Sequence, residues 1–125
     1  MKKYELQPTD LTTLRGKPLF QVVALRDFGL VLKGNKGGYI ESEANLSHNG
    51  NCWVSGDAWV FSNAQVFDNA RVFGNARVFD SAQVSGDARV YGDAWVCGDA
   101  RVYGDAWVFG AAYNHDNCPK CGEKL

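Results

Sequence analysis

Valine recurs at every sixth position over half of the chain, from Val54 to Val108. Two residues before each valine stands an alanine, except that Cys52 fills the first of these places. A helix needs apolar residues spaced by about 3.6, whereas Ala-x-Val-x alternates as a strand does. The pattern therefore predicts ten short strands over residues 51–110, with Ala and Val facing inward and the residues beside each Val facing outward.

Each six-residue unit closes on a pair such as Gly-Asp, Gly-Asn, Asp-Asn or Ser-Asn. These residues suit tight corners with positive φ, so we expect one strand and one corner per unit. Hexapeptide periodicity is typical of a parallel β-helix. Three units make an 18-residue coil, and coils stack about 4.8 Å apart. The ten units, with Asn45–Gly50 as a degenerate eleventh, predict nearly four coils.

The repeat resembles that of the hexapeptide-repeat left-handed β-helix family. The pattern of that family is an aliphatic residue followed four positions later by a small one, which here reads Val-Tyr-Gly-Asp-Ala or Val-Phe-Gly-Asn-Ala. The resemblance covers about half of the chain, and the left-handed winding rests on it alone, since most parallel crossovers are right-handed. The expected fold is an all-β, left-handed parallel β-helix of about four coils, with an N-terminal β cap and a short cysteine-containing tail.

We divide the chain into a cap (residues 1–44), a solenoid (45–110) and a tail (111–125). In the cap, PLFQVVALRDFG predicts a strand that ends at a turn, and LVLKGNKGGYIE predicts a second strand, a glycine-rich bend and the entry to the coils. A cap of this kind would cover the first layer of the solenoid. The stretch DFGLVLKGNKGGYIESEANLS also resembles the head of small solenoid proteins common in phages and prophages.

Charge and composition limit the kinds of partner and the cellular compartment that we expect for this protein. The formal net charge is −1, so no bulk field attracts nucleic acid or membrane. The apolar runs are short, and the start MKKYELQPTD lacks the apolar core of a signal peptide. We expect a protein of the bacterial host cytoplasm, without membrane partners, whose four cysteines are thiols or metal ligands.

The same family contains acyltransferases and carbonic anhydrases, but a fold does not carry function with it. The resemblance to acyltransferases implies a histidine general base, for which His48 is a candidate in the inward place of the first unit. The alternative for His48 is a hydrogen-bonded capping residue. A carbonic anhydrase needs three histidine ligands, and the chain has two histidines. The corner aspartates suit bonds to their own turns. We expect no enzyme, with an acyltransferase as the alternative.

Outward residues fall into three columns because position n stacks on n + 18. Two columns carry aromatic residues and arginine, which are enriched at binding hot spots, and we expect them to form a contact surface. A column with Gln65 and Gln83 is the expected solvent face. The proposed contact residues are Trp53, Arg71, Phe73, Arg89, Tyr91, Trp107 and Phe109 in the first column and Trp59, Phe61, Arg77, Phe79 and Trp95 in the second.

This surface predicts a self-associating protein, a dimer or trimer, that binds or masks a host protein. With the resemblance to phage proteins, counter-defence such as anti-CRISPR-like inhibition is one such role. Nucleic acid is a less suitable partner, because the ten units carry four arginines against seven aspartates.

The tail contains Cys118 and Cys121 at the spacing of a zinc knuckle, with His115 three residues before them. The 18-residue coil places Cys97 directly below His115. We therefore predict a structural zinc site made of Cys97, His115, Cys118 and Cys121, which would pin the tail over the last coil. The alternatives are a disordered tail with free thiols, or a metal shared between subunits.

Overall fold

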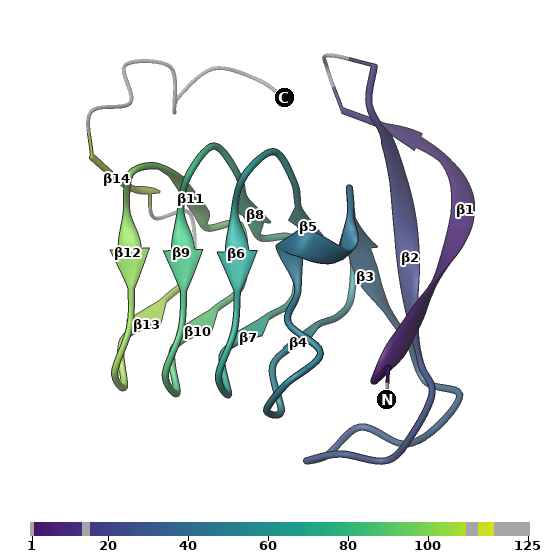
Figure 1. Ribbon diagram of the computed structural model, residues 1–125. Helices are drawn as coiled ribbons and strands as arrows, with labels where there is room; N and C mark the ends of the chain where they lie inside the picture. Colours follow the sequence, from purple (N-terminus) through teal and green to yellow (C-terminus); the bar gives the residue numbers. More distant parts are fainter. Residues whose placement is uncertain (1, 14–15, 110–112, 117–125) are drawn as a thin grey trace.

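Short parallel strands stack along one axis in the computed structural model, which describes residues 2–13 and 16–109, and the backbone of residues 113–116 (Figure 1). The described residues contain no α-helix and one 3₁₀ turn, η1 (Glu43–Asn45). No helix in this part of the chain is long and apolar enough to cross a membrane. The architecture is a parallel β-solenoid of about four coils, as the repeat predicts.

Three sheets form the sides of the prism. The first runs through both the head and the coils, in the order β1 (Tyr4–Thr12), β2 (Pro18–Ala24), β3 (Lys36–Ile40), β5 (Trp59–Val60), β8 (Arg77–Val78), β11 (Trp95–Gly98) and β14 (Tyr113–Asp116). The second contains β4 (Trp53–Val54), β7 (Arg71–Val72), β10 (Arg89–Val90) and β13 (Trp107–Val108). The third contains β6 (Gln65–Val66), β9 (Gln83–Val84) and β12 (Arg101–Val102).

The register between coils follows the repeat. Arg71 pairs with Arg89 and Arg89 with Trp107, each 18 residues further along the chain. The inward places are filled as predicted, because the alanines from Ala58 to Ala100 and the valines from Val54 to Val102 are at most 2% exposed. One continuous apolar core therefore runs along the axis.

The corners adopt the predicted left-handed backbone, and three of them do so without glycine. Ser62, Asp68 and Asp80 have φ of 59°, 59° and 60°. The carboxylates of Asp68 and Asp80 accept hydrogen bonds from Gly86 N–H at 3.1 Å and Gly98 N–H at 3.2 Å. These aspartates thus bond to the corner of the next coil, whereas we had expected bonds within their own turns.

The head closes the N-terminal end of the solenoid. Strand β1, which no pattern in the sequence predicts, pairs antiparallel with β2, and β3 then enters the coils by pairing parallel with β5. The second strand expected near residue 30 does not form, since Leu30 and Leu32 are 81% and 60% exposed and belong to no strand. Tyr4 and Phe28 complete the core at this end.

The first coil is longer than the others, which corrects the placement of His48. Tyr39 pairs with Trp59 and Leu46 with Val66, twenty residues further along in each case. Leu46, which is fully buried, takes the inward place that the repeat assigned to His48. The strict count of six fails between Leu46 and Val54, which are eight residues apart, because the segment before Cys52 adds two residues to this coil.

Placing a charge in the core tests the inward assignment. Val78 is fully buried in the middle of the stack. Val78→Asp should abolish the cooperative thermal transition seen by circular dichroism, because a buried carboxylate without a partner costs a large part of the ~5–15 kcal/mol that stabilises a domain. The matched control is Gln65→Asp, which adds the same charge at an exposed strand position and should melt near the wild type. A cooperatively folded Val78→Asp protein would contradict the assignment.

Candidate functional site

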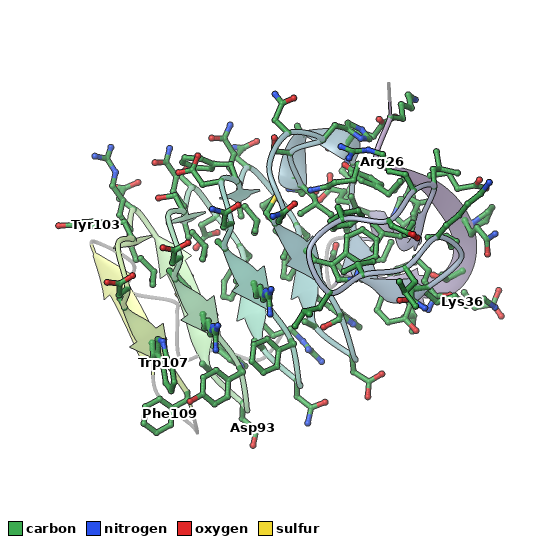
Figure 2. All side chains as sticks on the ribbon, turned by 90° about the horizontal axis from the view of Figure 1, so that it is seen from below. Arg26, Lys36, Asp93, Tyr103, Trp107 and Phe109 are labelled. Atoms are coloured by element: carbon green, nitrogen blue, oxygen red, sulfur yellow. The ribbon has the colours of Figure 1, made fainter. Side chains whose placement is uncertain are left out.

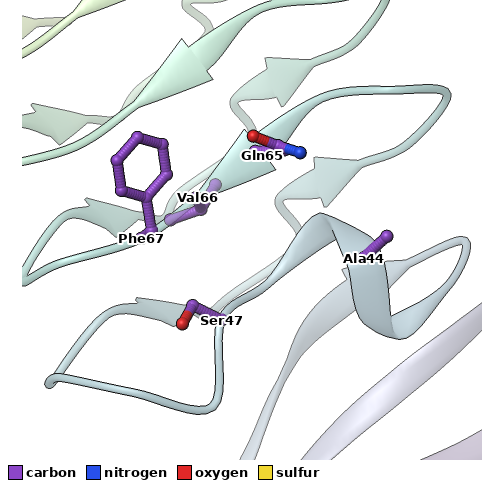
Figure 3. Close-up of a pocket in the computed structure, with 5 residues that line it drawn as sticks. All are labelled: Ala44, Ser47, Gln65, Val66 and Phe67. Atoms are coloured by element: carbon purple, nitrogen blue, oxygen red, sulfur yellow. The ribbon is translucent and has the colours of Figure 1, made fainter.

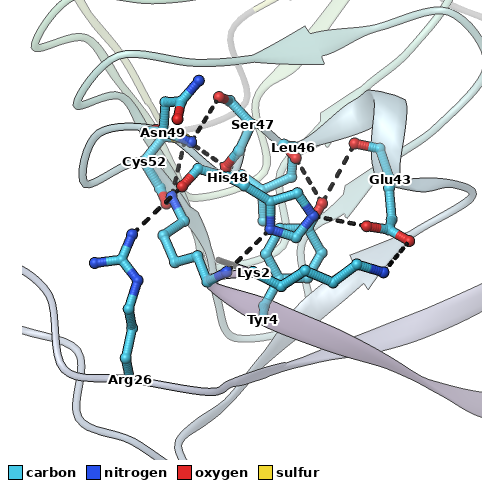
Figure 4. A network of polar contacts seen from close by, with 10 residues as sticks. Lys2, Tyr4, Arg26, Glu43, Leu46, Ser47, His48, Asn49 and Cys52 are labelled. Carbon is cyan, nitrogen blue, oxygen red and sulfur yellow. Dashed lines mark hydrogen bonds and ion pairs between the residues drawn. The ribbon is translucent and has the colours of Figure 1, made fainter.

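His48 lies where the N-terminus meets the first coil, and both of its ring nitrogens are engaged (Figure 4). Its Nδ1 accepts the backbone N–H of Lys3 at 3.1 Å, and its Nε2 lies 2.7 Å from the Glu43 carboxylate. Because Nδ1 accepts, Nε2 must carry the proton and donate it to Glu43. The ring also stacks on Tyr4, with centroids 4.1 Å apart. In this state His48 has no free lone pair with which to act as a base.

Glu43 joins His48 and Lys2 into a clasp between the chain start and η1. Lys2 Nζ donates to Glu43 at 3.2 Å, and the Tyr4 hydroxyl donates to Leu46 O at 2.5 Å. The hydrogen bonds from His48 and then from Lys2 hold the pKa of Glu43 below its ordinary value. Burial raises the pKa of Tyr4. The clasp thus fixes β1 on the first coil, which supports the capping role for His48.

A buried lysine lies beneath the clasp. Lys3 is fully buried, and its Nζ donates to Cys52 O at 2.7 Å and approaches Cys52 Sγ at 3.3 Å. The ammonium also lies 4.8 Å from the centre of the Phe28 ring. Burial lowers the pKa of Lys3 and raises that of Cys52. The carbonyl and sulfur atoms of Cys52 satisfy the buried amine. Lys3 can therefore lie at the N-terminal end of the core without an unpaired polar group.

A hollow of about 250 Å³ lies on the third side, next to β6 (Figure 3). Its lining residues are Ala44, Ser47, Gln65, Val66 and Phe67. Ser47 and Gln65 can hydrogen-bond a ligand, but the lining contains no carboxylate or imidazole to transfer a proton. The hollow therefore supplies no acid–base machinery.

The outward face of the second sheet carries a ladder of rings. Phe73 stacks on Tyr91 with centroids 4.9 Å apart, and Tyr91 stacks on Phe109 at 5.4 Å. Beside them Arg89 lies over Trp107, 5.4 Å from the ring centre. Exposure rises toward the C-terminal end, where Trp107 and Phe109 are each 56% exposed (Figure 2). We define the aromatic face as Arg71, Phe73, Arg89, Tyr91, Trp107 and Phe109.

The second aromatic column, in contrast, is largely covered. Phe61 and Phe79 are 5% and 6% exposed, and they form a cluster with Cys97 and with Leu19 of the head. Trp59, Trp95 and Arg77 are half-buried, and Arg77 lies over Trp59 at 4.5 Å. We expected both columns to be open. The head explains part of the difference, because its strands extend the first sheet and bring Leu19 over the rings.

Trp53 is also withdrawn from solvent, although it belongs to the first column. It is 6% exposed and packs edge-on against Phe28 and Tyr4 of the head. Of the twelve contact residues taken from the sequence, the structure thus leaves three exposed (Arg89, Trp107 and Phe109), six half-buried and three buried. The three exposed residues all belong to the aromatic face, whose other members, Arg71, Phe73 and Tyr91, are half-buried beside them.

Sequence reasoning missed the residues that hold the N-terminus. Lysine is rarely fully buried, so nothing in MKKYEL marks Lys3 as a core residue. Glu43 could have been paired with His48 only if η1 had been foreseen. Both assignments depend on the irregular first coil, which the repeat does not describe.

Part of the predicted zinc site falls within the described residues. Cys97 pairs with His115 in the parallel register of β11 and β14, as the 18-residue coil predicts. Cys97 is fully buried and disulfide-bonded in the structure. The His115 side chain, Cys118 and Cys121 lie outside the described residues. The disulfide differs from the expectation that the cysteines are thiols or metal ligands, because zinc is bound by a cysteine thiolate. The zinc site therefore stays a prediction for the reduced protein, and the register agrees with it at the backbone of Cys97 and His115.

Comparison with known proteins agrees with the repeat architecture. The family described as YdcK Beta solenoid repeat matches residues 64–79, 70–84, 82–98 and 94–110. The Uncharacterized acetyltransferase YdcK of Escherichia coli (strain K12) is 34% identical over 61 residues, which covers 43% of this chain and 19% of that protein. The match thus spans about a fifth of the relative's length. The chain is a hexapeptide-repeat-like β-solenoid, and the family matches begin at residue 64, beyond the head.

The clasp predicts how stability depends on pH. The pKa of Glu43 is lower in the folded protein, so the carboxylate stabilises the fold above its unfolded pKa of about 4.3 and loses this effect as the pH falls through the folded pKa. Glu43→Gln should lower the melting temperature at pH 7, and the difference from wild type should shrink in acid. Glu5→Gln, at an exposed position, is the control. A difference that does not change with pH would contradict a role for the carboxylate charge.

Metal analysis tests the zinc prediction. Protein purified under reducing conditions should contain about one zinc per chain, because four ligands close a structural site. Cys97→Ala should lose the metal, whereas Cys52→Ala removes a cysteine at the other end of the solenoid and should retain it. Wild-type protein without zinc, or zinc retained in Cys97→Ala, would show that Cys97 is not a ligand.

Proposed function

We propose that this protein is a non-enzymatic interaction module, a rigid β-solenoid that self-associates through its aromatic face. Trp107 and Phe109 carry the proposal, because these two large rings, in β13 and directly after it, are each more than half exposed. Monomeric proteins rarely leave contiguous apolar patches open. Tryptophan, tyrosine and arginine are also the residues that most often dominate binding energy.

The geometry of the face suits a protein partner. Stacked rings hold one another in place, so little side-chain entropy is lost on binding. Arg71 and Arg89 alternate with the rings and can bond to carboxylates or carbonyls of the partner. The partner in this proposal is first a second copy. A host protein in the bacterial cytoplasm is the further target, and counter-defence is the role consistent with the phage-like head.

The alternative function is acyl transfer, which the printed name of the YdcK relative keeps open. His48, the histidine with a described side chain, is committed to Lys3 N–H and Glu43, and the described hollow lacks a proton-transfer group. These contacts favour the interaction module. Turnover of acetyl-CoA that disappears in His48→Ala would instead support the enzyme.

Light scattering after size exclusion tests the self-association. The wild type should be a dimer or trimer at micromolar concentration, and Trp107→Gln/Phe109→Ser should be a monomer. Both replacements already occur at equivalent places of the repeat, Gln65 and Gln83 before valine and Ser55 and Ser85 after it, so the fold should persist. Phe67→Ser, which removes an outward ring from the third side, is the matched control. A monomeric wild type at high micromolar concentration would refute self-association.

A further inference from the structure

At the C-terminal end of the second sheet the inward side chains are at least partly exposed to solvent, whereas at the N-terminal end they are buried. Ala106 and Val108 occupy inward places, yet Ala106 is exposed and Val108 is only half-buried, whereas the preceding inward residues are covered. Among the described strands, β13 is the last of its sheet. Tyr103, at the preceding corner, is 68% exposed (Figure 2). The core therefore meets solvent along this strand.

The backbone of β13 is open as well. In the coils before it, Arg89 N–H donates to Ala106 O and Tyr91 N–H donates to Val108 O, both at 2.9 Å. The same direction of bonding points the N–H groups of Trp107 and Phe109 away from β10. Within the described part of the chain, neither group has an acceptor. An exposed strand edge beside apolar side chains is a template for another strand.

We propose that a second copy of this chain occupies that edge, so that two solenoids join end to end through antiparallel β13 strands. The inference rests on the proposed self-association and specifies its geometry. A two-fold axis at Val108 would pair Trp107 of one copy with Phe109 of the other. Each pair would exchange two backbone hydrogen bonds, as wide and narrow pairs alternate in antiparallel sheets.

Three features select a second copy over other strands. A two-fold axis presents each donor of the edge with its own acceptor, so the edge complements itself. In this register both Val108 side chains face the core, while Trp107 and Phe109 form cross-strand aromatic pairs on the aromatic face. Residues 106–109 carry no charge and the chain has a net charge of −1, so like charges do not oppose the approach.

Amide hydrogen exchange of the wild-type protein tests directly whether the backbone N–H groups at the edge of β13 are hydrogen-bonded. The amides of Trp107 and Phe109 should be protected at concentrations where light scattering shows a dimer, and should exchange freely after dilution to monomer. The Arg89 amide, bonded within the chain, should stay protected under both conditions. A dimer in which the Trp107 and Phe109 amides exchange freely would overturn edge pairing and leave self-association intact. A wild type that is monomeric throughout would overturn both.

Two variants of Phe109 separate the contribution of its backbone N–H to dimerisation from that of its ring. Phe109→Pro removes the ring and the N–H, whereas Phe109→Ser removes the ring alone. Loss of two intermolecular hydrogen bonds per dimer should raise the dimer Kd of Phe109→Pro about tenfold above that of Phe109→Ser. Phe73→Ser, two coils from the edge, should dimerise as the wild type does. Equal affinities for Phe109→Pro and Phe109→Ser, or dissociation by Phe73→Ser, would indicate face-to-face packing and overturn the proposal.

Discussion

Hydrogen bonds between successive coils are the constraint on which the rest of this structure depends. Trp53 N–H donates to Ala70 O, Arg71 N–H to Ala88 O, and Arg89 N–H to Ala106 O, each to a carbonyl one coil further along. A two-residue strand satisfies few polar groups by itself, so every coil relies on its neighbours. The columns of side chains follow from this bonding, because equivalent residues must lie above one another. The aromatic ladder is thus a consequence of backbone geometry as much as of aromatic attraction.

In the first coil, side chains satisfy many of the backbone polar groups that regular strand pairing satisfies in the later coils. Asn45 is fully buried, accepts the N–H groups of Glu41 and Ser42, and donates to Ser62 O and Ala64 O. Lys3 similarly donates to Cys52 O. Buried polar groups are stable only when they are bonded in this way. At the head, polar side chains therefore take the place of the hydrogen bonds that a preceding coil would make. The hydrogen bonds of His48 serve the same purpose.

The six-residue period was sufficient to predict the strands, the inward Ala and Val layer, the left-handed corners and the pairing of Cys97 with His115. It could not predict which outward column would be covered. Phe61 and Phe79 have the same local pattern as Phe73, and they differ because Leu19, distant in sequence, packs beside them. Nor could it place His48, since the first coil departs from the period between Leu46 and Val54, where two extra residues are inserted. Periodicity describes neighbours along the repeat, whereas these two features depend on contacts made by a non-repeating segment.

The longer first coil has a consequence for folding. Near-identical units can pair out of phase, since Val84 and Val96 stand at the same place of the repeat as Val90, the partner of Val72. Among the described pairs between coils, the twenty-residue spacing is found only at the head, between Ile40 and Val60 and between Leu46 and Val66. It distinguishes one alignment from all the others. A chain whose head forms first would add later coils to a template of fixed phase, and a chain nucleating in the repeats would become trapped in shifted registers.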